Sequence, residues 1–275
     1  MTKIYEALEH AKKAKQIEEQ SPIPEEESKP QSQVIETGPE AFTDAEPELF
    51  VKDDRVRLEK TVLRSFDLKL EKSLALLYQN IGHLLSNSSS KIVQFISARP
   101  QEGVPEILRE FAKLCSLKHQ KKVLIIDIKQ GRDSQIAHFQ LNGEIGWREA
   151  VDKEIDLNSI IQQVADTPLY VMTLLGKTFT RPLEPDSDEL NSFLSYLRDE
   201  YEFILIDTPS SVASTETLIL AEQVDGLVLV VEAGKTRWQV VDRIKQKVIS
   251  QGGNILGVIL NKRRFPIPNF IYKYL

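Results

Sequence analysis

A chain of 275 residues that is 41% hydrophobic can bury one sizeable core, and its formal net charge of -6 argues against a nucleic-acid-binding protein, which would need a basic face. The single cysteine, Cys115, excludes an internal disulfide framework and fits a reducing compartment. The four histidines lie too far apart in the sequence for a short-range metal motif.

The start of the chain, MTKIYEALEHAKKAK, lacks the continuous apolar core and the small-residue cleavage site of a secretory signal. The longest apolar run, around GLVLVV, is much shorter than the about 20 residues that cross a bilayer. We therefore expect a cytoplasmic protein, whose contact with a membrane would be peripheral or through a partner.

The composition divides the chain into three parts. In residues 1–16, Ile4, Leu8 and Ala11 recur at helical spacing, which predicts a short amphipathic helix. Residues 17–55 are rich in proline and carboxylates, a composition that does not repay the entropy of folding and predicts an acidic disordered linker. The linker is either a tether for the first helix or a tolerated tail. Residues 56–275 remain for one folded domain.

Short apolar strands alternate with helical patterns from about residue 60. Strands that are apolar along their whole length indicate a parallel sheet covered on both faces. We therefore predict a doubly wound α/β domain with its ligand crevice at the carboxyl ends of the strands. The expected elements are a helix around 70–81, a strand at 91–97, a helix at 105–119, a strand at 121–127, helical segments across 145–165, a strand at 169–175, a helix at 188–200, a strand at 202–207, a helix near 214–222, a strand at 225–234, a helix at 236–249 and a strand at 255–261.

The stretch FISARPQEGVPEI, residues 95–107, stands where a phosphate-binding loop would follow the first strand. Such a loop needs glycines whose N–H groups surround phosphates, a lysine for the β- and γ-phosphates, and a Ser or Thr hydroxyl for Mg²⁺. Gly103 stands at the last glycine, but Val104 takes the place of the lysine and Pro105 that of the hydroxyl. Proline suits the first turn of a helix, so the pattern predicts that the fold is kept while the chemistry is weakened.

Two more residues of this loop bear on anion binding. Gln101 stands where a glycine is expected and adds a side chain beside the phosphate path. Arg99 can attract an anion, although a lone loop arginine is more often a solvated surface residue.

Together these segments resemble the cytoplasmic tyrosine autokinases of bacterial polysaccharide biosynthesis, relatives of the MinD/ParA branch of P-loop NTPases. The resemblance runs from about residue 60 to residue 275, and MTKIYEALEHA also resembles the opening of many members. It implies a P-loop NTPase fold, ATP and Mg²⁺ as cofactors, and a membrane-embedded chain-length regulator or export protein as partner. The segments that carry it are FISARPQEG, KKVLIIDIKQGR, YEFILIDTPSS, VDGLVLVVEAGKTRWQVV and GGNILGVILNKRRFPIP.

The resemblance implies catalytic roles for two aspartates at strand ends. Asp127 is present, but Lys129 stands where the family usually has a second aspartate. Asp207 fits a Mg²⁺-coordinating role, although Ser210 stands where a proline is common. The alternative is that both carboxylates cap the turns after their strands.

Features of the family that concern assembly and phosphorylation are altered as well. Members carry a Glu-x-x-Arg-x-x-Arg motif that helps assemble rings, whereas this chain keeps Glu71 and has Leu74 and Leu77 at the arginine places, which puts a homo-oligomer of that kind in doubt. Members often end in a cluster of phosphorylated tyrosines. Here Tyr272 and Tyr274 are either acceptors for another kinase or packing residues of a terminal helix.

The basic tail NKRRFPIPNFIYKYL either rests on anionic lipid at the inner face of the plasma membrane or docks on the domain.

We expect a catalytically impaired regulator or adaptor of exopolysaccharide or capsule assembly and export, because phosphoryl transfer depends on the charges that Val104, Pro105 and Lys129 remove. The alternative is an active tyrosine autokinase or ATPase with a non-standard P-loop, using Arg99 or a neighbouring subunit's cation. A MinD-like positioning protein is a third interpretation, but its nucleotide switch would need the same loop.

Overall fold

The computed structural model describes residues 68–128, 134–153, 155–176, 188–208 and 215–263. The predicted N-terminal helix and acidic linker therefore lie outside the described residues, as do Lys129, Ser210, Tyr272 and Tyr274.

A seven-stranded sheet forms the centre of the described domain, with the strand order β3-β4-β2-β5-β1-β6-β7. Its strands pair in parallel except for the antiparallel pair of β3 and β4, which confirms the predicted doubly wound α/β fold. The strands are β1 (Lys91–Ser97), β2 (Val123–Asp127), β3 (Gln162–Gln163), β4 (Leu169–Thr173), β5 (Phe203–Asp207), β6 (Gly226–Glu232) and β7 (Ile255–Asn261).

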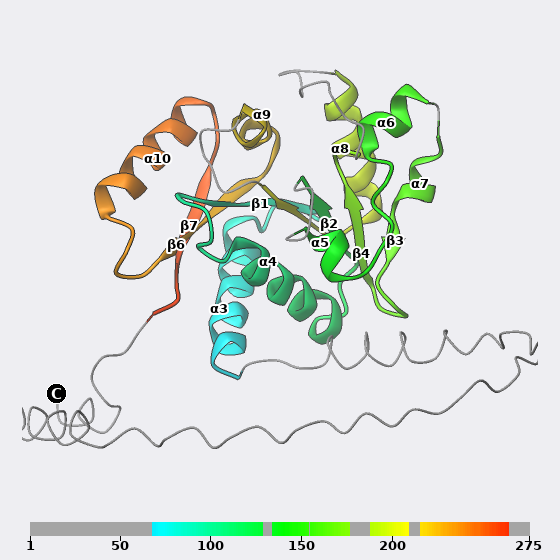
Figure 1. Ribbon diagram of the computed structural model, residues 1–275. Coiled ribbons are helices and arrows are strands. Elements are labelled where there is room, and N and C mark those ends of the chain that lie inside the picture. The colour runs from blue at the N-terminus through cyan, green and yellow to red at the C-terminus, as the bar shows by residue number, and fades with distance from the viewer. Residues whose placement is uncertain (1–67, 129–133, 154, 177–187, 209–214, 264–275) are drawn as a thin grey trace, which may run out of the picture. The chain divides into compact units, whose positions relative to one another are not determined.

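Helices cover both faces of this sheet, with α3 and α4 on one face and α8, α9 and α10 on the other (Figure 1). The α-helices are α3 (Leu68–Leu84), α4 (Val104–Lys113), α5 (Gln135–His138), α6 (Trp147–Asp152), α7 (Leu157–Ile160), α8 (Asp188–Glu200), α9 (Thr215–Gln223) and α10 (Trp238–Ser250). A π-helical turn, η1 (Leu114–Lys118), continues α4.

Alternating side chains of the central strands supply two separate cores. In β1, Ile92 and Ile96 pack with α8, α9 and α10, whereas Val93 and Phe95 pack with α3 and α4. Successive side chains of a strand point to opposite faces, so a strand buried on both faces must be apolar throughout. This explains why β1, β2, β5 and β6 are nearly continuous apolar runs in the sequence.

Two short elements were not predicted. The helix α5 is the next described element after β2, and the strand β3 lies within the region expected to be helical across 145–165. An element of four residues or fewer is too short to show a hydrophobic period, so the sequence pattern carries no signal for it.

A charged pair fixes the edge of α8 against the start of β1. Arg198 donates two hydrogen bonds to Asp225, at 2.8 and 2.9 Å, and Asp225 also accepts the backbone N–H of Ile92 at 2.7 Å. One carboxylate thus holds α8, the turn before β6 and the second residue of β1 together.

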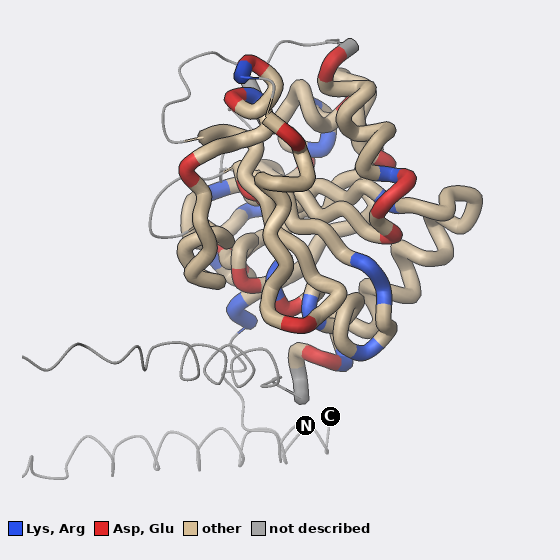
Figure 2. Tube along the Cα trace, turned by 90° about the vertical axis from the view of Figure 1, so that its right-hand side faces the viewer, with Lys and Arg blue, Asp and Glu red and all other residues tan. Residues whose placement is uncertain are grey.

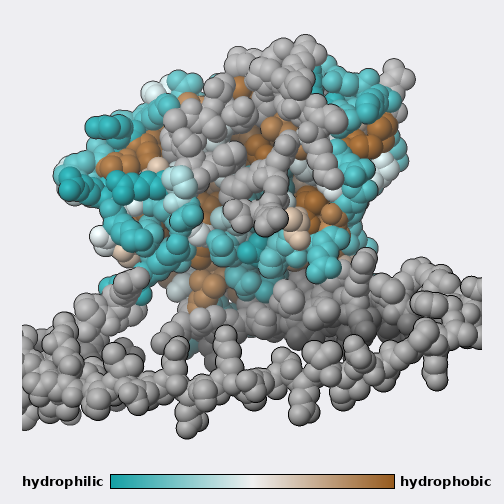
Figure 3. Space-filling view, viewed as in Figure 1, coloured by the Kyte–Doolittle hydropathy of each residue, from teal (hydrophilic) through white to brown (hydrophobic). Residues whose placement is uncertain are grey.

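The surface of the domain mixes both charge signs and carries small apolar patches. Along the trace in Figure 2, acidic and basic residues alternate without a face of one sign in that view. Hydrophilic residues cover much of the described surface in Figure 3, interrupted by hydrophobic patches. Within the described part, every helix is too short or too polar to cross a bilayer.

Candidate functional site

The loop between β1 and α4 folds around two residues with left-handed backbone conformation. Gln101 has φ 65°, a region that glycine adopts without strain, which fits the expectation of a glycine at this place. Gly103 has φ 94°, and an added Cβ there would clash with the side-chain nitrogen of Asn261. The same nitrogen donates to the carbonyl oxygen of Glu102 at 2.8 Å, so the end of β7 is hydrogen-bonded to the loop.

The carboxylate of Glu102 holds the loop from inside. Its side chain is 2% exposed and accepts the N–H of Arg99 at 2.9 Å and the N–H of Glu232 at 3.2 Å. It also accepts the hydroxyl of Thr236. An acidic group of the chain therefore binds an N–H of the loop, an N–H at the end of β6 and a hydroxyl of the β6–α10 turn.

Val104 and Pro105, at the lysine and hydroxyl places, are both part of the packing and hydrogen bonding of α4. Val104 is 2% exposed and belongs to the core formed with β1 and α4. Pro105 lies in the first turn of α4, as expected from its sequence position, and its carbonyl oxygen accepts a side-chain N–H from Gln135 at 3.1 Å. Neither residue supplies the cation or the hydroxyl that a phosphate and its metal require.

The structure brings the two predicted aspartates together. Asp127 and Asp207 are register partners at the ends of β2 and β5, and both are 0% exposed. Asp127 accepts the backbone N–H groups of Gln135 at 2.5 Å and Ile136 at 3.3 Å, and so caps the first turn of α5. Asp207 accepts a side-chain N–H of Gln135 at 2.6 Å. The observed bonds match the capping alternative for Asp127.

Two functional residues escaped the sequence reasoning. Gln135 is 0% exposed, and its side-chain oxygen accepts an N–H of Arg109 at 3.1 Å. Burial lowers the pKa of Arg109, while the carboxylates of Glu106 and Glu110, followed by Asp207 and Asp127, act in the opposite direction. Arg109 lies one turn after Pro105 on the same face of α4, a spacing that was visible in the sequence. Gln135 carries no charge or motif that could have marked it.

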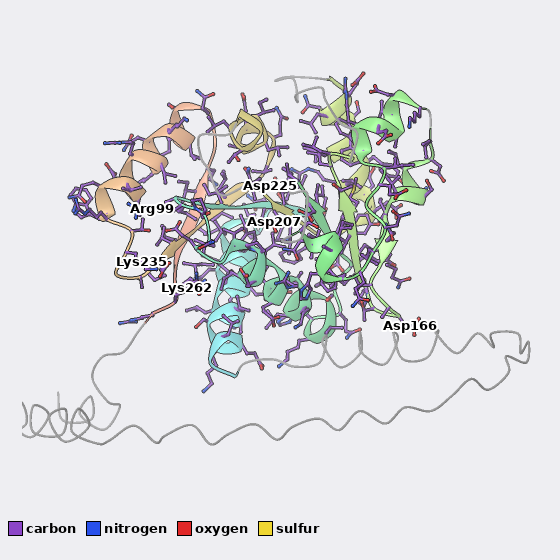
Figure 4. The ribbon with its side chains drawn as sticks, in the orientation of Figure 1. Arg99, Asp166, Asp207, Asp225, Lys235 and Lys262 are labelled. Atoms are coloured by element: carbon purple, nitrogen blue, oxygen red, sulfur yellow. The ribbon has the colours of Figure 1, made fainter. Side chains whose placement is uncertain are left out.

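Arg99 does not join this cluster through any bond that the structure shows. Its side chain is exposed, and Figure 4 places it with Lys235 and Lys262, apart from Asp207. Lys262 donates to the carbonyl oxygen of Gln101 and lies 3.9 Å from the carboxylate of Glu232. Arg99, Lys235 and Lys262 therefore lie on the surface around the loop, apart from Asp207 (Figure 4).

These residues do not fit a Mg²⁺–nucleotide pair bound in the usual way. The lysine place is filled by a buried valine, and both aspartates accept hydrogen bonds from Gln135. In the described residues, His, Cys, Asp and Glu form no group of three or more that could hold a metal ion.

The altered assembly motif also lies within the described residues. Leu74 is 2% exposed and packs into the core beneath α3, and Leu77 is half-buried against the same core. Glu71 forms an ion pair with Lys118 of η1 in the same chain. The leucines at the arginine places therefore pack against their own domain.

Comparison with known proteins relates the chain to one group. No protein-family model matches it. It is 27% identical over 179 residues to the tyrosine-protein kinase CpsD of Streptococcus agalactiae, covering 64% of this chain and 77% of the relative. It is also similar to the crystal structure of the VpsO kinase domain, with a TM-score of 0.59 and 27% identity, covering 77% of this chain and 98% of that domain.

The wider fold extends beyond kinases. The MinD cell division protein of Aquifex aeolicus, solved with MinC, has a TM-score of 0.54 at 16% identity, covering 64% of this chain and 70% of that one. At this identity the likeness concerns the fold alone, and it confirms the predicted MinD-like P-loop NTPase architecture.

Proposed function

The chain is a homologue of bacterial tyrosine-protein kinases with the fold of their kinase domains, and from this premise we propose that it is a catalytically impaired regulator or adaptor rather than an active kinase. The observation that carries the proposal is the pair of buried strand-end aspartates, whose described hydrogen bonds come from Gln135 and the start of α5. A kinase needs such carboxylates to position metal and nucleophile, and a displaced or diverted carboxylate costs catalysis steeply.

The loop supports the same proposal by a separate route. Val104 and Pro105 supply no charge and no hydroxyl, and the carboxylate of Glu102 already binds the N–H of Arg99, a loop donor that a phosphate could otherwise use. A homologue that uses nucleotides would bind ATP and Mg²⁺ at the loop between β1 and α4. Here we assign Asp127, Gly103, Val104 and Pro105 to structural roles, and we retain Asp207 as the residue that would hold Mg²⁺ if the site works.

The test is tyrosine phosphorylation by the purified full chain with ATP and Mg²⁺, compared with Asp207→Ala. We expect no phosphotyrosine in either protein, even at high protein concentration. Robust phosphorylation by the wild-type protein that Asp207→Ala abolishes would establish the alternative, an active autokinase with a non-standard P-loop.

The resemblance further suggests a setting for such a regulator. We propose that it acts in exopolysaccharide or capsule assembly at the inner face of the plasma membrane, on a membrane-embedded chain-length regulator or export protein. The first 16 residues and the basic tail from Lys262 onward are the segments we assign to that contact, with residues 17–55 as the linker between the helix and the domain. Co-purification of that protein with the full chain, and its loss without residues 1–16, is the expected result; equal recovery would contradict the assignment of the helix.

Tyr272 and Tyr274 are proposed acceptors for another kinase. Mass spectrometry of the protein from its native cells should find phosphate on one of them, and unmodified peptides under polysaccharide-producing conditions would contradict this role.

A further inference from the structure

The side chain of Gln135 lies at the point where the two aspartates and the first turn of α4 meet. Ser134 caps α5 by accepting the N–H of Ala137 at 3.1 Å, which fixes Gln135 as the first residue of that helix. Its backbone N–H is bound to Asp127, so only the carboxamide is left to point toward β5 and α4. The position of the carboxamide is therefore set by the helix start.

The carboxamide contacts three residues on two elements, β5 and α4. Its nitrogen donates to Asp207 of β5 at 2.6 Å and to the carbonyl oxygen of Pro105 at 3.1 Å. Its oxygen accepts from Arg109 of α4 at 3.1 Å. Two N–H donors and one acceptor are nearly the whole capacity of an amide, and the residue is 0% exposed. The hydrogen bonds of the buried carboxamide are therefore made to groups of the protein itself.

Gln135 lies between the first turn of α4 and the strand-end carboxylate of Asp207, the two places where a P-loop site holds its phosphate and its metal, although the carbonyl oxygen of Pro105 is itself no phosphate ligand. In a working P-loop site, the first turn of the helix faces phosphates and the strand-end carboxylate faces the metal. Here the first turn, through Pro105, and the strand-end carboxylate, Asp207, are joined by one amide group. The guanidinium of Arg109 supplies the positive charge beside two buried carboxylates.

We propose that Gln135 is an internal occupant of this site, whose carboxamide engages both Asp207 and Arg109 and so excludes a metal–nucleotide pair. The inference rests on the proposed function and names the residue responsible for the exclusion. The inference is separate from the replacement of the lysine and the hydroxyl by Val104 and Pro105. It concerns the space that the Gln135 side chain fills and the hydrogen-bond partners that it occupies.

The experiment measures binding of Mg²⁺–ATP to the full-length protein by calorimetry, and the rise in unfolding temperature that a ligand of the native state produces. The proteins are wild type, Gln135→Ala, the double variant Gln135→Ala with Arg109→Ala, and the control Gln239→Ala on the exposed face of α10. We expect no saturation for wild type and control, and a gain of at least about tenfold in affinity for Gln135→Ala, or about 1.4 kcal/mol. The gain should disappear in the double variant, since Arg109 is the cation that the substitution releases.

The failures of this inference and of the proposed function are distinguishable. If Gln135→Ala stays as inert as wild type, or if wild type already binds as tightly as Gln135→Ala, Gln135 is not the excluding group and the inference is overturned. Phosphotyrosine formed by the wild-type protein would instead overturn the proposed function. If Gln135→Ala does not fold, Gln135→Asn, which shortens the amide by one methylene, is judged by the same outcomes.

Discussion

The carboxylate of Glu102 accepts the backbone N–H of Glu232 at 3.2 Å, which joins the loop after β1 to the end of β6. The same carboxylate binds the N–H of Arg99, so the loop keeps its shape through a group of its own chain. Glu102 therefore links the loop to the neighbouring strand through hydrogen bonds within the chain.

This arrangement predicts a large cost for Glu102→Ala. Two half-buried N–H groups would lose a charged acceptor, and we expect a loss of about 1–3 kcal/mol in the free energy of unfolding, measured by urea denaturation. Glu102→Gln keeps one acceptor oxygen and should cost less. The matched control is Glu200→Ala, which removes an exposed ion pair with Lys122 and should change stability by about 0.5 kcal/mol or less. Equal effects of the two alanine variants would contradict the role of Glu102.

The leucines of α3 give a second prediction from two neighbouring positions. Leu74 is 2% exposed and Leu76 is 57% exposed on the same helix. Leu74→Arg, which restores the residue that the related motif would have, should destabilise the protein by about 3 kcal/mol or more, because it buries a charge in the core under α3. Leu76→Arg should stay within about 1 kcal/mol of wild type. Thermal unfolding of both variants checks this, and a harmless Leu74→Arg would show that α3 can detach from the core.

The Arg198–Asp225 pair gives a third prediction. Asp225→Ala should lower the free energy of unfolding by about 1–3 kcal/mol, and Arg198→Ala by about 1 kcal/mol or less. The difference is expected because Asp225 also accepts the N–H of Ile92. Arg198→Lys keeps the charge but loses the two-bond geometry, so it should resemble Arg198→Ala. Urea denaturation of the three variants provides the comparison. A greater cost for Arg198→Ala than for Asp225→Ala would mean that the bond to Ile92 contributes little.

Sequence reasoning worked where a residue's neighbours in the chain determine its environment. The apolar runs predicted the strands β1, β2, β5 and β6, because a strand that is buried on both faces is apolar along its whole length. Pro105 was placed correctly in the first turn of α4 for a similarly local reason. Asp127 and Asp207 were placed correctly at strand ends, and they are neighbours because parallel strands end at the same edge of the sheet.

The hydrogen-bond partners of the site were beyond such reasoning. Gln135 is separated from Asp207 by 72 positions, and Glu102 from Glu232 by 130. Amide and carboxylate side chains of this kind are common on surfaces, and only the topology shows that these are buried. The helix α5, which carries Gln135, was itself too short to predict.

His138 gives the last prediction, on the dependence of stability on pH. Burial lowers the pKa of this imidazole to about 4, with the cations Arg109 and Lys113 acting in the same direction and Glu106 against it. In the unfolded chain the pKa is about 6.5, so on acidification the unfolded state binds the proton first. The contribution of His138 to stability is therefore present above pH of about 6.5 and is lost as the pH falls toward about 4. His138 is an exposed residue, and solvent therefore reduces the size of the effect.

The measurement is an NMR titration of His138 together with urea denaturation at several pH values between about 4 and 7. His138→Asn should flatten the decline of stability over this range, because it removes the group that gains a proton on unfolding. His83, which lies in the last turn of α3, offers a matched control, and His83→Asn should leave the slope that His138 causes unchanged. A titration midpoint of His138 near 6.5 would show that neither burial nor the cations Arg109 and Lys113 lower the pKa of the imidazole, and the slope should then be the same in wild type and His138→Asn.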